Sequence, residues 1–215
     1  MRPALRSCLA VVVMGSSLFG VSIRSAGADP TPGFLETWSS TTMDWGGGSS
    51  VTNPGTGGVG GFGDGFLLVA TPTVGNLGTR SIGGPYPGNW MTAGITYVRF
   101  ALLDVGSDEP LEIHFSIGYG TNLWQSTAGF SPPGNGWGEF SIDLIAANFT
   151  QIIGTGTFED ALQTVDRIHF RHDLPPFAQA PDLIQGDFGL DHLFLGNEMT
   201  PALSMTWGRI KSLYQ

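Results

Sequence analysis

The sequence predicts an all-β fold, an antiparallel β-sandwich, and two observations carry this prediction. The first is an alternation of apolar and polar residues. In the run 111–117 every second residue is apolar, while Glu112, His114 and Ser116 fall on the opposite face. The second is the regular interruption of such runs by glycine, proline and asparagine, which is typical of sandwiches and barrels built from short strands.

The expected strands follow one another along the chain. The run 66–70 is continuously apolar, so we expect it in the centre of a sheet. The glycine-dense stretch 44–65 is expected to form a long loop around one or two short edge strands. Within the body of the chain, only residues 157–165 show helical periodicity, which predicts at most two turns of helix. The expected strands span residues 34–38, 66–70, 97–103, 111–119, 123–129, 138–144, 165–171 and 188–195.

The first 28 residues have the pattern of a secretory signal peptide. Two arginines precede an apolar run that ends at Ile23, and small residues follow up to Ala28. The run is too short and too rich in serine and glycine for a membrane span. We therefore expect a secreted bacterial protein, extracellular or at the cell surface, with a sandwich domain at 29–197 and no transmembrane segment in the mature chain.

The last residues, 198–215, differ from the body. Pro201 separates them from it, and aromatic and basic residues recur at helical spacing between Trp207 and Tyr214. This ending is similar to those of otherwise different exported bacterial proteins, which implies a sorting or attachment element. The alternative is a frayed terminus with one aromatic ring packed back on the body.

The charge balance makes nucleic acid an unlikely partner. The whole chain carries nine Lys+Arg against 18 Asp+Glu, a formal net charge of −9. Three of the arginines and none of the acids belong to the first 28 residues, so the mature chain is more acidic still. Such a surface repels phosphate backbones. It suits a soluble exported protein, a divalent cation, or a neutral or cationic ligand.

Two acidic residues lie on strands that a sandwich often places side by side. Glu36 belongs to the first expected strand and Asp191 to the last. Carboxylates and loop carbonyls are the ligands that Ca²⁺ prefers. Asp44 and Asp187 are further candidates. The alternative is that these acids are solvated at strand ends.

Several short motifs occur in an order that resembles a known family. The chain opens with Phe34-Leu35-Glu36, contains Gly-Trp-Gly-Glu-Phe at 136–140, and closes with Gly-Leu-Asp-His-Leu-Phe-Leu at 189–195. This order is similar to the galactose-binding-like jelly rolls of carbohydrate-binding modules, and the likeness spans roughly residues 34–196. The resemblance implies a jelly roll with at most one or two short helices and a structural calcium ion held by Glu36 and Asp191. The inserted Leu35 departs from the family pattern.

Two sets of residues are candidates for binding a ligand. Aromatic rings stack on sugar rings, and Trp90, Trp124 and Tyr119 lie in or beside turns. The alternative for each tryptophan is packing in the core or at an edge. The second set lies on the polar faces of two expected strands, where a patch suited to sugar acids forms if the strands are neighbours. That set comprises His114, His169 and Arg171.

These observations favour a non-catalytic, lectin-like carbohydrate-binding domain, stabilised by calcium, whose partner is a polysaccharide or another glycan. One alternative is a structural or cell-surface matrix protein without a small-molecule site. The other is a polysaccharide lyase or hydrolase. The sequence contains neither a Tyr-x-Lys-x-Gly-x-Tyr strand nor the Glu-x-Asp-x-x-Glu strand of retaining jelly-roll glycosidases. Whether the protein is an enzyme stays open.

Overall fold

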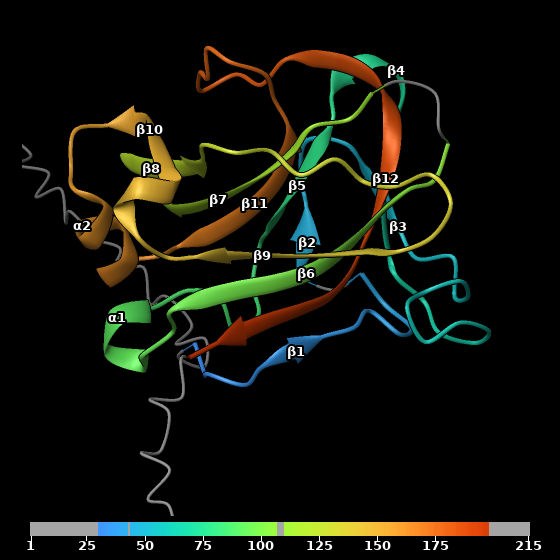
Figure 1. Ribbon diagram of the computed structural model, residues 1–215, viewed down its shortest axis with the longest axis horizontal. Coiled ribbons are helices and arrows are strands. Elements are labelled where there is room, and N and C mark those ends of the chain that lie inside the picture. Colours follow the sequence, from blue (N-terminus) through green and yellow to red (C-terminus); the bar gives the residue numbers. More distant parts are fainter. Residues whose placement is uncertain (1–29, 43, 107–109, 198–215) are drawn as a thin grey trace, which may run out of the picture.

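Two antiparallel sheets of six strands each form the fold in the computed structural model (Figure 1). The model describes residues 30–42, 44–106 and 110–197, so the expected signal peptide and C-terminal element lie outside the described residues. The two sheets enclose one apolar core. The expected all-β jelly-roll sandwich is confirmed.

The first sheet, sheet A, has the long strand β12 near its centre. Its first half pairs with β4 and its second half with β6 and β1. The expectation that the first and last strands are neighbours is therefore confirmed. The strands in spatial order are β3 (Ser50–Thr52), β4 (Leu67–Asn76), β12 (Leu183–Gly196), β6 (Tyr97–Asp104) and β9 (Gly138–Asp143), with β1 (Leu35–Glu36) also on β12.

The second sheet, sheet B, carries the candidate ligand site. Its central strands β7 and β11 pair directly, as do β11 and β5. The strands in spatial order are β10 (Phe149–Gly154), β8 (Asn122–Ser126), β7 (Ile113–Tyr119), β11 (Arg167–His172), β5 (Gly78–Ser81) and β2 (Trp45–Gly46).

The core is built from the inward residues of both sheets and is rich in aromatic rings. Phe100 of sheet A lies edge-on to Phe170 of sheet B, with ring centroids 4.9 Å apart. Phe115 lies 5.4 Å from the same ring. All three side chains are buried. Burying each such ring contributes about 1.5–3 kcal/mol, which suits a domain without cysteine, since the one cysteine of the chain, Cys8, precedes it.

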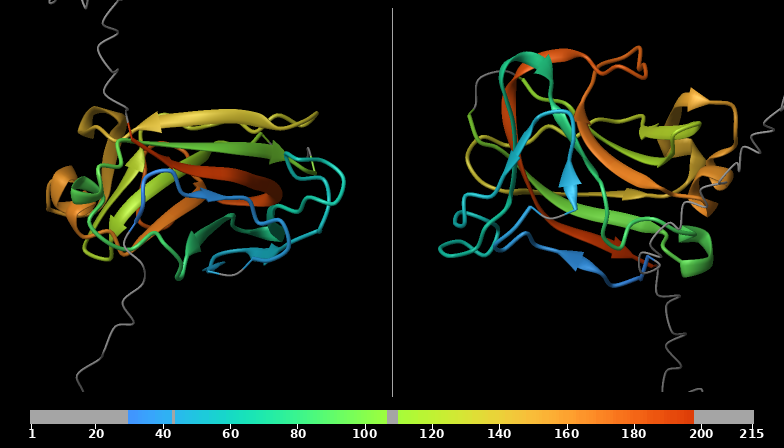
Figure 2. Two further views of the ribbon diagram at one scale, coloured as in Figure 1. Left: turned by 90° about the horizontal axis from the view of Figure 1, so that it is seen from below. Right: turned by 180° about the vertical axis from the view of Figure 1, so that it is seen from behind.

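Two short helices close one end of the sandwich, and the glycine-rich loop lies at the other end (Figures 1 and 2). Helix α2 (Phe158–Gln163) confirms the expected helical turn, and α1 (Trp90–Ala93) packs against it. A 3₁₀ turn, Ala146–Asn148, precedes β10. None of the helices in the described part of the chain is long and apolar enough to cross a membrane.

Three elements were not expected from the sequence. Helix α1 begins after a turn cluster, where the Asn89 side chain accepts a hydrogen bond from the Thr92 amide at 2.9 Å. Strand β10 has no clean alternation, and β5 contains no large apolar residue. Both strands form because neighbouring strands of sheet B supply their hydrogen-bonding partners, an effect that local pattern does not contain.

Candidate functional site

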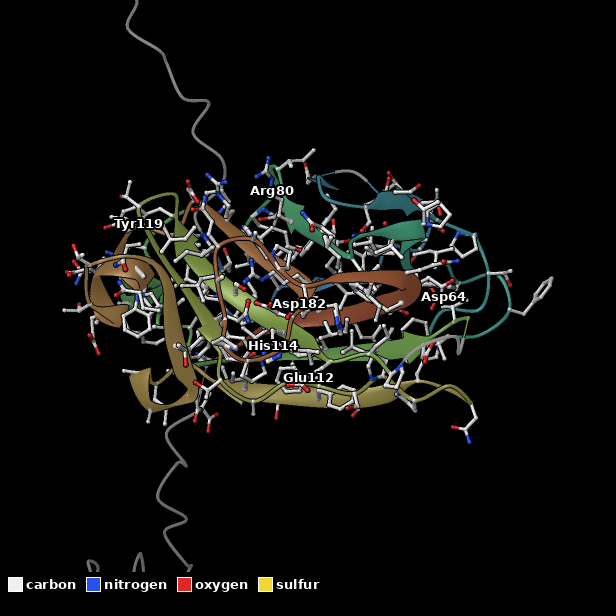
Figure 3. The ribbon with its side chains drawn as sticks, turned by 90° about the horizontal axis from the view of Figure 1, so that it is seen from above. Asp64, Arg80, Glu112, His114, Tyr119 and Asp182 are labelled. Carbon is white, nitrogen blue, oxygen red and sulfur yellow. The ribbon has the colours of Figure 1, made fainter. Side chains whose placement is uncertain are left out.

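The outer face of sheet B brings together the polar residues expected to share a patch. In the register of β7 and β11, Arg171 lies opposite His114 and His169 lies opposite Ser116. On the other side of β11, His169 lies opposite Arg80 of β5. Side chains opposite one another in a sheet project to the same face. Figure 3 looks onto this face, with Arg80 on one side and His114 on the other.

A loop after β11, residues 173–182, crosses this face, and we call it the strap. Asp182, near its end, lies between Arg80 and His114 in Figure 3. The Arg171 guanidinium holds the strap through three of its residues. It donates to the Ala178 carbonyl at 2.7 Å, to the Gln179 carbonyl at 3.0 Å and to the Asp173 carboxylate at 2.6 Å. Arg171 therefore fastens the strap to the sheet.

The centre of the face is closed by the strap. His114 is fully buried, with the Phe177 ring of the strap 4.8 Å from its own ring. Its Nδ1 lies 2.7 Å from the Ser126 carbonyl oxygen and its Nε2 lies 3.2 Å from the Glu112 carboxylate. The structure thus places His114 and Arg171 beneath the strap, where their polar atoms already have protein partners.

Beside the strap an open cleft of about 240 Å³ runs along β5 and β11. Arg80 and His169 contribute side chains from the sheet, Asn76 lies at the end of β4, and Gln179 contributes from the strap. Gly47, Gly48 and Arg171 also line it. The Arg80 side chain is exposed and has no ion-pair partner among the described residues.

His169 lies at the floor of this cleft in a positive electrostatic environment. Burial, together with the charges of Arg167, Arg171 and Arg80, lowers the pKa of His169 to about 3, against a smaller opposing effect of Asp166. Its Nε2 is buried and has no hydrogen-bond partner within the described part of the chain. The imidazole is therefore neutral at ordinary pH.

The three aromatic candidates do not converge on the cleft. Trp90 is fully buried in the core, where its indole donates to the Tyr86 carbonyl at 2.7 Å, so the expected role in stacking on a sugar does not fit its position. Trp124 is half-buried at the end of the sandwich and packs edge-on against Phe158, with ring centroids 5.6 Å apart. Tyr119, the last residue of β7, lies at one end of the molecule, apart from Arg80 (Figure 3).

A second cluster of polar residues lies on sheet A, beside the glycine-rich loop. Ligand atoms of Asp64, Asp191 and His192 lie within 4.8 Å of one another. Asp191 is fully buried and accepts hydrogen bonds from the amides of Val59 and His192, each at 2.7 Å. Asp64 accepts one from the Gly60 amide, also at 2.7 Å.

The bulge in β12 creates this cluster. The pairing of β12 with β6 shifts register between Asp191 and Phe194, and His192 has a positive φ of 49°. This turns the adjacent residues 191 and 192 toward one site instead of opposite faces. Burial raises the pKa of Asp191, and the charge of Asp64 adds to the rise.

The cluster fits a divalent cation, with a different ligand set from the expected one. The carboxylates of Asp64 and Asp191 approach each other beside Gly58, which has no side chain. A Cβ at this position would lie 2.7 Å from Asp64 and 3.0 Å from Asp191. The carboxylates suit calcium, while an imidazole is a ligand that zinc and other transition metals accept. The sequence did not indicate Asp64 as a ligand, because a glycine-rich segment without periodicity does not predict where its side chains lie.

The other expected metal ligands lie outside this three-residue cluster. Glu36 is half-buried, and its carboxylate accepts a hydrogen bond from the Trp38 amide at 3.4 Å. Burial raises its pKa, with smaller contributions from the charges of Asp44 and Asp191. The Asp44 side chain is exposed and lies against Gly83 and Gly84.

No protein-family model and no curated protein matches the sequence. Among solved structures, the chain is similar to a family 11 carbohydrate-binding module from Clostridium thermocellum, in complex with a β-1,3-1,4-mixed-linked tetrasaccharide. The two are 18% identical over 78% of this chain and 98% of the module, with a TM-score of 0.49.

Two further solved structures are similar to the chain. One is the CBM22-1 xylan-binding domain of Xyn10C from Paenibacillus barcinonensis, 12% identical over 78% of this chain and 97% of that domain, with a TM-score of 0.46. The other is an exo-β-agarase, 10% identical over 76% of this chain and 24% of that enzyme, with a TM-score of 0.48. At these identities the likeness concerns the fold and carries no conclusion about a ligand.

Proposed function

We propose that the protein is an exported, non-catalytic carbohydrate-binding domain whose ligand occupies the cleft beside the strap. The observation that carries the proposal is the set of side chains lining this cleft. Arg80 supplies hydrogen-bond donors, and Asn76 and Gln179, whose side-chain amides can both donate and accept, also line the cleft. Sugar hydroxyls require both kinds of partner, and binding sites orient polar ligands with a few such groups.

The rigidity of the surrounding sheet supports the same proposal. His169 and Arg80 lie on paired strands, and the strap is fastened by Arg171. A site whose polar groups are already fixed loses less conformational entropy when a ligand binds. A flexible, hydroxyl-rich ligand such as a glycan therefore meets a preformed surface.

Affinity gel electrophoresis on a polysaccharide panel tests the proposal. The mature protein is expected to be retarded by at least one polysaccharide, and Arg80→Ala is expected to reduce that retardation. Arg99→Ala is the matched control, because Arg99 is also exposed but lies on β6 of sheet A, over the Phe194 ring. Migration unchanged by every polysaccharide would contradict carbohydrate binding and favour a structural or matrix role.

We further propose that a divalent cation, calcium in the first instance, binds at Asp64, Asp191 and His192. Two adjacent carboxylates repel each other, and in Asp191 the charge is also buried. A bound cation offsets both costs. It would join the glycine-rich loop to β12, and so hold one end of the sandwich together.

Removal of the cation is expected to lower the melting temperature. A ligand present at 100 times its Kd stabilises the folded state by about 2.7 kcal/mol, and this corresponds to about 5–10 °C for a domain of this size. Chelation should therefore lower Tm by several degrees, and Asp191→Ala should abolish the response. Asp64→Asn is the milder variant if Asp191→Ala does not fold.

The identity of the cation can be separated from its presence. His192→Gln should leave the response to calcium intact, because calcium is bound through oxygen, but should weaken a response to zinc. Identical melting curves with and without chelator, in protein supplied with calcium or zinc, would refute the cation site.

A further inference from the structure

The arginines of the sandwich are concentrated on one face. Residues 30–197 contain four arginines and no lysine. Arg80, Arg167 and Arg171 belong to adjacent strands of sheet B and Arg99 alone lies on sheet A. The outer face of sheet B therefore carries three of the four arginines of this range, together with the acids Asp166, Asp173 and Asp182.

Only one of these three arginines is free to bind a ligand. Arg167 makes a bidentate ion pair with Asp166 at 2.7 and 2.8 Å. Arg171 is held by Asp173 and the strap. The Arg80 guanidinium lines the open cleft, is exposed, and has no ion-pair partner in the described part of the chain. A guanidinium matches the planar geometry of an oxyanion through two parallel hydrogen bonds.

The charged side chains around His169 are relevant to the kind of ligand that the cleft can bind. His169 experiences the positive charges of Arg167, Arg171 and Arg80, and only Asp166 acts in the opposite direction. The charges that act on His169 are therefore mostly positive, while Asp173 and Asp182 act on Arg171 of the same face. An anionic group placed in the cleft would offset part of the positive charge that acts on His169.

We propose that the cleft recognises an acidic carbohydrate, with Arg80 binding the oxyanion substituent, a carboxylate or a sulfate, of one sugar. This inference rests on the proposed carbohydrate-binding function and specifies its ligand class. Asn76 and Gln179, at the edges of the cleft, contact hydroxyl groups of the same or the next sugar. The strap limits the ligand to the side of the sheet that carries β5.

The negative net charge of the protein does not prevent this. At physiological ionic strength charges beyond about 8 Å are largely screened, so a bound group responds mainly to nearby side chains. Among the residues that line the cleft, Arg80 is the charged one without an ion-pair partner in the described part of the chain. Asp182 of the strap lies on the same face, where it accepts a hydrogen bond from the Leu174 amide at 2.8 Å, but it does not line the cleft.

The test compares acidic and neutral polymers in the same gel and salt series. Polygalacturonate carries carboxylates, a sulfated galactan carries sulfates, and galactan carries neither. Retardation by one or both acidic polymers and little by galactan supports the inference. Arg80→Gln should weaken that binding by about tenfold or more, Arg80→Lys should restore part of it, and Arg99→Gln should change nothing.

A second measurement follows the cleft directly. In an NMR titration of His169, adding galacturonate should raise the pKa of the imidazole from about 3, because the anion offsets the charges of Arg80, Arg167 and Arg171. Galactose should have no such effect, and Arg80→Gln should reduce the effect of galacturonate. An unchanged His169 titration at saturating galacturonate would overturn the inference.

The outcomes separate this inference from the function on which it rests. Equal retardation by galactan and by the acidic polymers would overturn the acidic specificity and leave carbohydrate binding in place. Absence of retardation by any polysaccharide would overturn the proposed function itself, and the specificity with it.

Discussion

At the scale of the residue, the ion pair of Arg171 and Asp173 determines what the face of sheet B can do. Both side chains are almost completely buried, and their atoms approach to 2.6 Å. The Gln125 amide also donates to Asp173 at 2.9 Å, so the carboxylate has partners on both β8 and β11. The pair closes the middle of the face and leaves the cleft at its side.

Removing one member of this pair is expected to be costly. Asp173→Ala leaves the Arg171 charge buried without its counterion, which costs about 3–5 kcal/mol of unfolding free energy. The double variant Arg171→Met, Asp173→Leu should cost less than the sum of the single variants, because it leaves no buried charge behind. Urea unfolding of Asp173→Ala, of the double variant and of its two single components measures both effects.

The more exposed pair of Arg167 and Asp166 provides the control. Its side chains are about 30% and 26% exposed, compared with 7% and 2% for Arg171 and Asp173. Exposed ion pairs contribute about 0–1 kcal/mol, so Asp166→Ala should have a small effect. Equal destabilisation by Asp166→Ala and Asp173→Ala would show that burial does not determine the strength of the Arg171 pair.

Sequence patterns predicted which residues share a face better than which residues meet a ligand. The alternation around His114 and His169 correctly placed them on one face of adjacent strands. It could not show that the strap covers His114, because the sequence of a loop without periodicity does not predict the path of its backbone. Trp90 has polar neighbours in sequence, yet its side chain turns inward because burial of a large ring outweighs local context.

At the scale of the element, helix α2 shows how local chemistry and packing act together. Thr157 and Asp160 form a reciprocal capping box, with hydrogen bonds of 3.1 Å in both directions. Phe158 then enters the core and stacks on Phe149 at 4.6 Å. The helical spacing of the apolar residues predicted this element, because the residues that face the core recur every three or four positions.

Loss of the cap should destabilise the domain by a modest amount. Thr157→Ala removes the side-chain oxygen that accepts from the Asp160 amide, which costs about 0.5–2 kcal/mol. Thr121→Ala is the control, because Thr121 is also exposed but lies in the turn between β7 and β8. Chemical denaturation compares the two variants, and equal midpoints would contradict a stabilising cap.

The strands that the sequence did not predict are those specified by their neighbours. Strand β5 pairs on one side with β11 and on the other with β2, and its Thr79 and Ser81 side chains are buried despite being polar. The Ser81 hydroxyl accepts a hydrogen bond from the Ile168 amide at 3.1 Å. Such a strand is stabilised by contacts with residues distant in sequence, so the local pattern of apolar and polar residues does not predict it.

At the scale of the whole molecule, the buried histidines couple folding to pH. Burial lowers the pKa of His169 to about 3 and also lowers that of His172. Both groups are neutral in the folded state and bind a proton more readily when the chain unfolds. Their contribution to stability is therefore fully present above pH 6.5 and is lost as the pH falls toward the folded pKa.

Glu36 and Asp191 respond in the opposite direction. Burial raises their pKa values, so each acid is protonated more readily in the folded state than in the unfolded one. Their protonation therefore relieves a cost as the pH falls through the folded pKa. The pH dependence of the stability of the whole protein combines these opposite contributions. A variant of a single group isolates the contribution of that group.

His169→Gln is expected to flatten the loss of stability between pH 7 and pH 5. In the wild-type protein His169 alone costs about 1.4 kcal/mol of unfolding free energy for each pH unit below 6.5, or about 2 kcal/mol at pH 5. The glutamine variant lacks this contribution, whatever its stability at neutral pH, because an amide does not titrate. Urea unfolding at several pH values measures the two slopes, with Arg99→Gln as a control for a change remote from the cleft. Parallel slopes for the wild type and His169→Gln would show that the imidazole binds protons equally in the folded and unfolded chain, and that neither burial nor the surrounding arginines perturb it.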